Sequence, residues 1–222
     1  MITVLRRAAW WAADYLYAGY WQVRAFISRT RPEAFTDGTR APIVVLPGVY
    51  EPWRFLQPLI VHLHERGHPI HVLDALERNQ RPVVEVAAIV EHHLREHDLH
   101  GAVLVAHSKG GLAGKLVMVG PEGSRVRGML AVATPFGGSR YARHLPSRTL
   151  RAFSPDDPGI VSLARHQEVN ARIVSVYGEF DPHIPEGSEL PGAKNVQLRT
   201  GGHFRVLADP RVIAEVAVLA GD

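Results

Sequence analysis

The stretch AVLVAHSKGGL at residues 102–112 constrains the fold of this chain more than any other part of its sequence. Residues 103–105 are β-formers without polar alternation, which predicts a parallel strand covered on both faces of its sheet. Ser108 follows between small residues, as in the nucleophile elbow G-x-S-x-G, with Ala106 in place of the first glycine and Gly110 as the second. The sharp strand-to-helix turn of that elbow needs small neighbours, because larger side chains would collide with nearby backbone. The stretch therefore predicts a buried strand, a strained turn at Ser108 and a helix, although an ordinary glycine-rich turn has a similar pattern.

Apolar runs and helical patterns alternate through most of the chain. After residue 42, short runs without polar alternation predict strands, and longer segments with helical periodicity predict helices. The expected strands cover 43–46, 70–73, 102–106, 128–133, 173–177 and 196–198, and the expected helices cover 53–66, 83–96, 112–119 and 212–219. Repeated strand–helix units predict an α/β fold with a mostly parallel central sheet and helices on both faces. A chain of 222 residues suits one such domain, which we place at residues 42–222.

Residues 1–30 predict a separate, aromatic and amphipathic helix. Tryptophans and tyrosines gather there, and apolar residues recur at helical spacing. The continuous apolar part, residues 8–23, is shorter than the ~20 residues of a membrane span, contains Asp14 and does not match a signal peptide. Two interpretations stay open: the helix packs against the core or a partner subunit of a homo-oligomer, or it lies in a membrane interface with its arginines at the head groups. We expect residues 31–41, a segment with several charges, a proline and a glycine, to form a linker.

Charge and cysteine content exclude several functions. The net charge of +3 and the isoelectric point near 9.4 make the chain mildly basic, but its basic residues are spread out, so we expect no nucleic-acid partner. The chain has no cysteine, which excludes disulfides, thiolate catalysis and cysteine-type zinc sites. Residues 64–68 match the zinc motif H-E-x-x-H, but Gly67 and Pro69 predict that the helix ends between the histidines, so no metal is expected. Without a recognisable export signal, we expect a cytoplasmic protein, with peripheral membrane contact left open.

A nucleophilic serine needs a base to take its proton and a third group to orient that base. After a nucleophile elbow, the chain order is serine, acid, histidine. Asp181 follows the expected strand 173–177, and His203 follows the expected strand 196–198. Because functional groups of open α/β sheets gather at the carboxyl ends of the strands, we expect Ser108, Asp181 and His203 to converge. The weaker candidates are Asp74, Asp157 and Glu179 for the acid and His183 for the base.

An acyl-transfer site also needs backbone N–H groups aimed at the oxyanion of its tetrahedral intermediate. We expect one from Lys109, directly after the serine, and one from Val49, where Gly48 lets the chain turn sharply after the first core strand. On this interpretation Lys109 acts through its backbone, and its side chain is expected in solvent. His107 is expected to point away from the nucleophile and to be structural.

Several motifs resemble those of known enzymes. AHSKGG, ATPFGGS, SVYGEFDPHIP and KNVQLRTGGHF, with LPGVYEP upstream, are similar to motifs of small bacterial lipases and esterases of the α/β-hydrolase superfamily, in particular those with a minimal lid. The resemblance covers residues 42–220 and leaves the N-terminal helix unexplained. It implies an enzyme without a cofactor, with Ser108 as nucleophile, Asp181 as acid, His203 as base, and Val49 and Lys109 as oxyanion donors.

The chain departs from that family's pattern in two places. Pro47 and Gly48 stand where a His-Gly pair is common, so any role of that histidine in holding the loop is absent. The cap-like segment, residues 134–168, is short, which implies an open and shallow acyl site.

Together the patterns predict a serine hydrolase that cleaves carboxylic esters of acyl or lipid type through an acyl-enzyme. One alternative keeps the triad and transfers the acyl group to another acceptor, as an acyltransferase or a remodelling enzyme of lipid or glycolipid esters. A second alternative is a non-catalytic scaffold of the same fold that is tethered to a membrane or a partner by residues 1–30.

Overall fold

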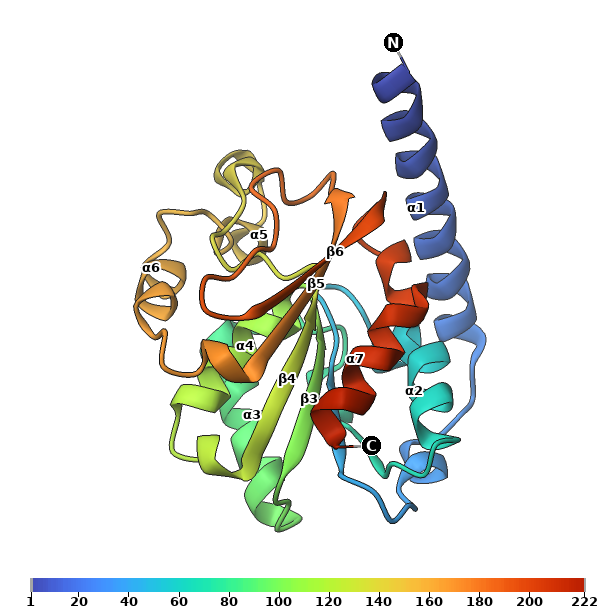
Figure 1. Cartoon of the computed structure of the whole chain (residues 1–222), viewed down its shortest axis with the longest axis vertical. Helices are drawn as coiled ribbons and strands as arrows, with labels where there is room; N and C mark the ends of the chain where they lie inside the picture. Colours follow the sequence, from blue (N-terminus) through green and yellow to red (C-terminus); the bar gives the residue numbers. More distant parts are fainter. Residues whose placement is uncertain (1, 222) are drawn as a thin grey trace.

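Six parallel strands form one central sheet in the computed structural model, which describes residues 2–221 (Figure 1). The strand order is β2-β1-β3-β4-β5-β6. The predicted α/β class with a parallel sheet is confirmed, whereas Met1 and Asp222, the outer ends of the expected helix and domain, lie outside the described residues. The strands are β1 (Ile43–Leu46), β2 (Ile70–Val72), β3 (Ala102–His107), β4 (Val126–Val132), β5 (Ile173–Phe180) and β6 (Lys194–Gly201).

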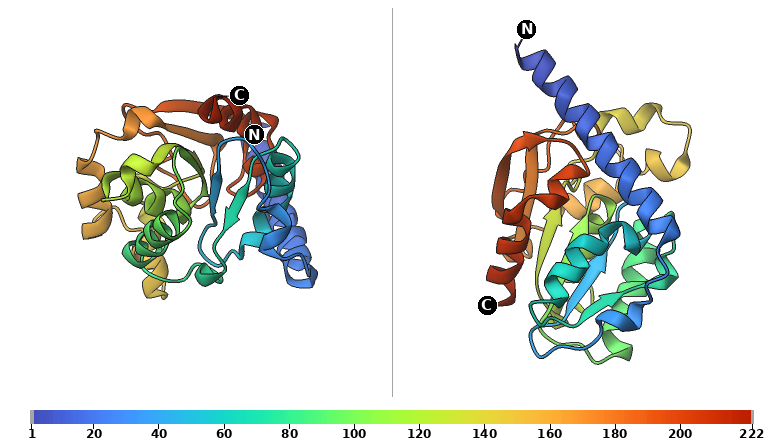
Figure 2. Two further views of the ribbon diagram at one scale, coloured as in Figure 1. Left: turned by 90° about the horizontal axis from the view of Figure 1, so that it is seen from below. Right: turned by 90° about the vertical axis from the view of Figure 1, so that its right-hand side faces the viewer.

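Helices cover both faces of the sheet, as predicted (Figures 1 and 2). Alternate residues of β1 enter different cores: Val44 and Leu46 pack under α3, α4 and α6, whereas Ile43 and Val45 pack under α2 and α7. Both faces of the strand are apolar because both are buried. The α-helices are α1 (Ile2–Ile27), α2 (Gln57–His64), α3 (Val83–Glu96), α4 (Lys109–Val119), α5 (Arg148–Arg151), α6 (Pro158–Arg165) and α7 (Pro210–Ala220). The 3-10 helices are η1 (Pro32–Phe35), η2 (Trp53–Leu56), η3 (Asp74–Leu76), η4 (Gly123–Arg125), η5 (Arg140–His144), η6 (Asn170–Arg172) and η7 (Arg205–Ala208).

Helix α1 lies along one side of the domain, and its N-terminal turns extend beyond the rest of the molecule (Figures 1 and 2). Tyr17 contacts Phe55 edge-on, with ring centroids 6.5 Å apart, and Asp14 is fully buried. One side of the helix therefore packs against the core, as the first interpretation expected, while its outer side is exposed. Within residues 2–221, no helix combines the length and apolar character needed to cross a bilayer.

The segment after α1, which we expected to be a linker, packs against the domain. The ring of Phe35 in η1 is buried against Trp53 and His64. The backbone N–H groups of Thr39 and Arg40 both donate to the carbonyl oxygen of Gly67, each at 3.1 Å. The connection is thus packed onto the body of the protein rather than loose.

Candidate active site

Ser108 occupies a strained turn between β3 and α4, as the elbow pattern predicts. Its φ of 50° and ψ of −119° lie in a region that residues with a Cβ rarely adopt. Glycine is sterically required at positions 110 and 111, in the first turn of α4. A Cβ at Gly110 would overlap the carbonyl oxygen of Leu46, and one at Gly111 would overlap the Thr134 hydroxyl. The backbone N–H of Ser108 donates to Val132 of β4 at 2.8 Å. These constraints fix the hydroxyl at the carboxyl end of the sheet.

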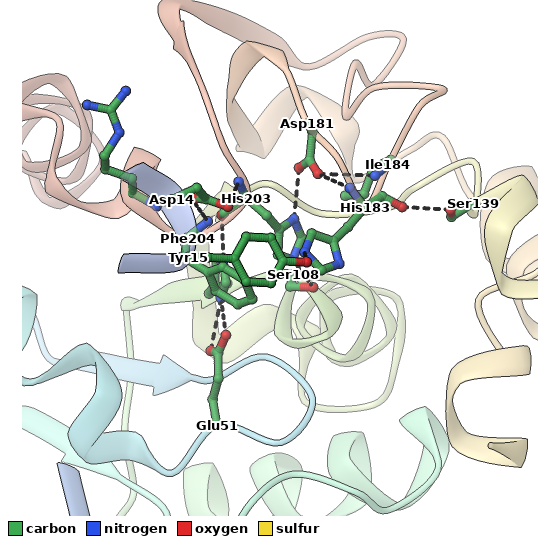
Figure 3. Close-up of polar contacts among 12 residues, drawn as sticks. Asp14, Tyr15, Glu51, Ser108, Ser139, Asp181, His183, Ile184, His203 and Phe204 are labelled. Atoms are coloured by element: carbon green, nitrogen blue, oxygen red, sulfur yellow. Dashed lines mark hydrogen bonds and ion pairs between the residues drawn. The ribbon is translucent and has the colours of Figure 1, made fainter. Parts of the chain in front are cut away.

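The structure brings Ser108, Asp181 and His203 together, although they lie far apart in the sequence (Figure 3). His203 Nε2 lies 2.9 Å from the Ser108 hydroxyl, and His203 Nδ1 lies 2.8 Å from Oδ2 of Asp181. The three residues follow β3, β5 and β6 at the same edge of the sheet. All three are buried, with Ser108 8% and His203 5% exposed. A serine, an imidazole and a carboxylate in this chain of contacts have the geometry of an activated nucleophile.

The pKa shifts of Asp181 and His203 support an ionised acid and a basic histidine. Burial by itself would lower the pKa of His203, but the Asp181 carboxylate beside it raises that pKa above its usual 6.5. Burial would raise the pKa of Asp181, but His203 and the backbone N–H of His183 outweigh it, and the pKa falls below its usual range. Asp181 Oδ1 accepts from the N–H groups of His183 at 2.7 Å and Ile184 at 3.1 Å. Asp181 therefore holds a proton on His203 Nδ1 and leaves Nε2 free to accept from Ser108.

The two expected oxyanion donors belong to the start of α4 and to the loop after β1. Lys109 is the first residue of α4, where a backbone N–H has no acceptor within the helix and the helix dipole is positive. Val49 lines the same pocket as Ser108. Its loop is tightly turned, because the following residue, Tyr50, has a φ of 64°.

A buried contact between Glu51 and His107 braces that loop, and sequence reasoning did not find it. A Glu51 carboxylate oxygen accepts from the backbone N–H of Gly48 at 2.7 Å and lies 2.9 Å from His107 Nδ1. His107 Nε2 lies 3.0 Å from the carbonyl oxygen of His203. Both partners of the imidazole, the Glu51 carboxylate and the His203 carbonyl oxygen, are hydrogen-bond acceptors. The expectation that His107 points away from Ser108 agrees with these contacts, which join the loop of Gly48 and Val49 to the backbone of His203.

The expected solvent exposure of the Lys109 side chain is wrong. That side chain is only 1% exposed, and its ammonium donates to the carbonyl oxygen of Asn79 at 2.8 Å, to Asn79 Oδ1 at 3.1 Å and to the carbonyl oxygen of Arg81. Asn79 Nδ2 in turn donates to the carbonyl oxygen of Pro47 at 2.6 Å. Burial lowers the pKa of Lys109 to about 8. The side chain is buried because the loop before α3 covers it, and Asn79 links it to the loop that contains Pro47 and Val49.

Asp14 of helix α1 holds the loop that carries His203. Its Oδ2 accepts from the N–H of His203 at 2.9 Å, and its Oδ1 accepts from the N–H groups of Phe204 at 2.8 Å and Arg205 at 2.7 Å. A carboxylate with three backbone donors is well satisfied in a buried position. The sequence signal for this role was a lone acid in the middle of an apolar helix.

We expect Asp14→Asn to lower kcat for the expected ester hydrolysis by about 10- to 100-fold, with little change in KM. The amide oxygen keeps the bonds to Phe204 and Arg205, but the amide NH₂ then faces the N–H of His203. The repulsion between these two donors should displace the His203 ring, and a small displacement of that ring lowers the reaction rate strongly. The free energy of unfolding should fall by about 1–3 kcal/mol. The rising limb of the pH–rate profile should also move to lower pH, because Asp14 contributes to the raised pKa of His203. Steady-state kinetics and denaturant unfolding measure these changes, and an unchanged kcat would remove the positioning role of Asp14.

An apolar pocket of about 440 Å³ adjoins the Ser108 hydroxyl. His183 also lines it, with its ring centroid 4.7 Å from that of His203 and its Nε2 3.1 Å from the Tyr15 hydroxyl. Burial lowers the pKa of His183 to about 4, so its ring is neutral near pH 7. The cap-like segment 134–168, from which we expected an open and shallow site, supplies much of the apolar wall of this pocket. Its contributions are Pro135, Ala142, Leu145, Leu150 and Phe153.

The weaker candidates for the acid serve other contacts. Asp74 accepts from the indole N–H of Trp53 at 2.6 Å, and Glu179 pairs with Arg6 at 3.2 Å. Asp157 caps α6 by accepting from the N–H of Gly159.

The two histidines of the H-E-x-x-H match do not share a helical face. Helix α2 ends at His64, and Gly67, with a φ of 91°, turns the chain before His68. His64 Nε2 lies 3.3 Å from Asp37, whereas His68 Nδ1 lies 2.9 Å from the carbonyl oxygen of Ala41.

Known structures share this fold at low sequence identity. A carboxylesterase from Nitrososphaera gargenis has a TM-score of 0.60 at 12% identity and covers 84% of this chain and 93% of its own. The mature lipase of Bacillus licheniformis has a TM-score of 0.64 at 15% identity, with 82% and 92% covered. The monoacylglycerol lipase of Paleococcus ferrophilus has a TM-score of 0.59 at 15% identity, with 83% and 96% covered. The chain therefore has the α/β-hydrolase fold. No protein-family model matches the sequence, and no curated protein is similar to it.

Proposed function

We propose that this protein is a serine hydrolase that cleaves carboxylic esters with apolar acyl groups. The observation that carries the proposal is the continuous chain of contacts from Asp181 through His203 to Ser108, at the side of an apolar pocket. The similarity to esterases and lipases in fold is in keeping with this chemistry. Because one fold hosts many functions, the geometry of the site is the stronger support.

In the proposed reaction, the Ser108 hydroxyl attacks the ester carbonyl while His203 Nε2 takes its proton. The backbone N–H groups of Val49 and Lys109 stabilise the oxyanion of the tetrahedral intermediate. His203 then protonates the departing alkoxide, which leaves as an alcohol and yields an acyl-enzyme. Water attacks the acyl-enzyme with His203 again as base, and the acid product leaves. The apolar lining of the pocket favours an aliphatic or aromatic acyl group over a charged one.

A fluorophosphonate probe tests the proposal directly. Such a probe phosphonylates a serine only when a base and oxyanion donors activate it, so we expect one label per chain, located at Ser108 by peptide mass spectrometry. Labelling should proceed in parallel with loss of p-nitrophenyl ester hydrolysis. A protein that takes up no label and cleaves no ester across a series of acyl lengths would instead be a non-catalytic scaffold.

Turnover of a p-nitrophenyl ester in the presence of a competing alcohol separates hydrolysis from acyl transfer. With a competing alcohol present, a hydrolase forms mainly the free acid, whereas an acyltransferase forms mainly the new ester. Product analysis by mass spectrometry distinguishes the two outcomes, because labelling of Ser108 is expected in both.

A further inference from the structure

The outer side of helix α1 is an apolar surface that the domain leaves uncovered. Leu16 is 75% exposed and Phe26 is 89% exposed. At ~100° per residue, the exposed apolar side chains fall within about half of the helix circumference. Trp10, Asp14 and Ala25 lie on the opposite half, toward the body of the protein. The exposed set, termed the outer face, consists of Val4, Leu5, Trp11, Tyr15, Leu16, Tyr20, Val23, Phe26 and Ile27.

Positive charge borders the outer face. Residues 2–31 contain five arginines and one acid, the buried Asp14, so they carry a net charge of +4, whereas the whole chain carries +3. Arg6 and Arg24 are separated by 18 residues, about five helical turns, so both lie along one edge of the outer face. Arg7 lies near its other edge. The excess positive charge of the protein is therefore concentrated around its most exposed apolar helix.

We propose that the outer face of α1 binds the surface of an anionic lipid bilayer, with the helix lying in the plane of the interface. Apolar and aromatic side chains would enter the head-group boundary, while arginines on both edges pair with lipid phosphates. A second copy of this chain is a poorer occupant. Two such faces would bring arginines against arginines, and α1 itself has no exposed acid, although Arg6 pairs with Glu179 of β5.

The bilayer surface would adjoin the pocket beside Ser108. Gln22 of α1 lines that pocket, and Tyr15 of the outer face contacts His183 in its wall. Tyr141 and Leu145, which also line the pocket, are 52% and 37% exposed. Binding through α1 would therefore hold the pocket close to lipid, but the proposal does not depend on what the pocket binds.

Vesicle sedimentation of point variants tests the proposal on the full chain. Deletion of α1 is unsuitable, because it also removes Asp14 from the His203 loop. We expect the parent protein to sediment with vesicles of phosphatidylcholine and phosphatidylglycerol in a two-to-one ratio. Replacing Leu16, Val23 and Phe26 together with glutamine should weaken partitioning about 100-fold or more, because three apolar side chains no longer leave water on binding.

A matched control uses exposed valines on other helices. The triple variant Val84→Gln, Val161→Gln and Val218→Gln changes side chains of α3, α6 and α7 that are also exposed, and it should partition like the parent. Thermal unfolding and hydrolysis of a soluble ester should be unchanged in both triple variants, since neither set touches the contacts of Ser108, His203 or Asp14.

The charge of the binding surface is tested separately. Arg24 lies in the last turn of α1, and Arg29 lies two residues beyond its end; both are exposed. Arg24→Gln combined with Arg29→Gln should weaken binding to anionic vesicles about 30-fold at low salt, at roughly 1 kcal/mol per arginine. Binding to vesicles of phosphatidylcholine alone should be weak for the parent and insensitive to these changes.

Three outcomes would overturn the proposal. One is a parent protein that does not sediment with anionic vesicles. Another is equal loss of binding in the outer-face variant and the valine control. The third is a parent dimer, seen by light scattering, that the outer-face variant converts to a monomer, because a second copy would then cover the outer face.

Discussion

Ser108→Ala is expected to lower kcat/KM for ester hydrolysis by about a million-fold. In the proposed reaction the hydroxyl oxygen is the atom that forms the acyl bond, and removing the nucleophile of a Ser-His-Asp site leaves only binding and oxyanion stabilisation. Alanine fits the turn as well as serine does, because both residues place a Cβ at the same positive φ. Only the 2.9 Å contact with His203 is lost, so the free energy of unfolding should change by about 1 kcal/mol or less.

The measurement combines hydrolysis of p-nitrophenyl esters with covalent labelling. Ser162→Ala serves as the control, because Ser162 is an exposed serine of α6. The control should retain the activity and the label, whereas Ser108→Ala should lose both while it keeps its circular dichroism spectrum. A Ser108→Ala protein as active as the parent would show that the reaction, if any, uses another nucleophile.

The elements that local sequence determines were predicted closely. The expected bounds of β1 and α3 agree with the structure, since a short apolar run and a strong helical periodicity are local signals. Strands β5 and β6 run further than expected, to Phe180 and Gly201, because they pair with each other to their ends. The expected helix over 53–66 is split into η2 and α2, and Pro58 stands in the first turn of α2, where a missing N–H is tolerated.

The contacts of the candidate site were predictable only in part. Serine, acid and histidine were found because each follows a strand that ends at one edge of the sheet. The support around them depends on tertiary contacts, as between Asp14 and the N–H of His203, which are 189 residues apart in sequence. Lys109 was misplaced for the same reason, because its burial depends on a loop about thirty residues earlier in the chain. Local patterns thus located the three residues of the proposed triad, whereas the contacts that support them come from segments that only folding brings near.

Asp181→Asn is expected to lower kcat by about ten-thousand-fold through a change in the tautomer of His203. The backbone N–H groups of His183 and Ile184 both donate to Oδ1 of Asp181, so an asparagine would keep its carbonyl oxygen at that position. Its NH₂ group would then face His203 Nδ1 in place of the carboxylate oxygen at 2.8 Å. Nδ1 would have to accept a hydrogen bond, which places the ring proton on Nε2, toward Ser108, where it cannot act as a base.

The pH dependence of the reaction distinguishes this tautomer effect from simple loss of folding. In the parent protein, Asp181 raises the pKa of His203, so activity should increase with pH through a midpoint above 6.5, as the imidazole loses its proton. In Asp181→Asn, burial still lowers that pKa and the carboxylate no longer opposes it, so the residual activity should show a midpoint at lower pH. Asp157→Asn is the matched control, because asparagine caps α6 as well as aspartate does and Asp157 does not contact His203. An Asp181→Asn enzyme with the midpoint of the parent would show that Asp181 does not set the protonation of His203.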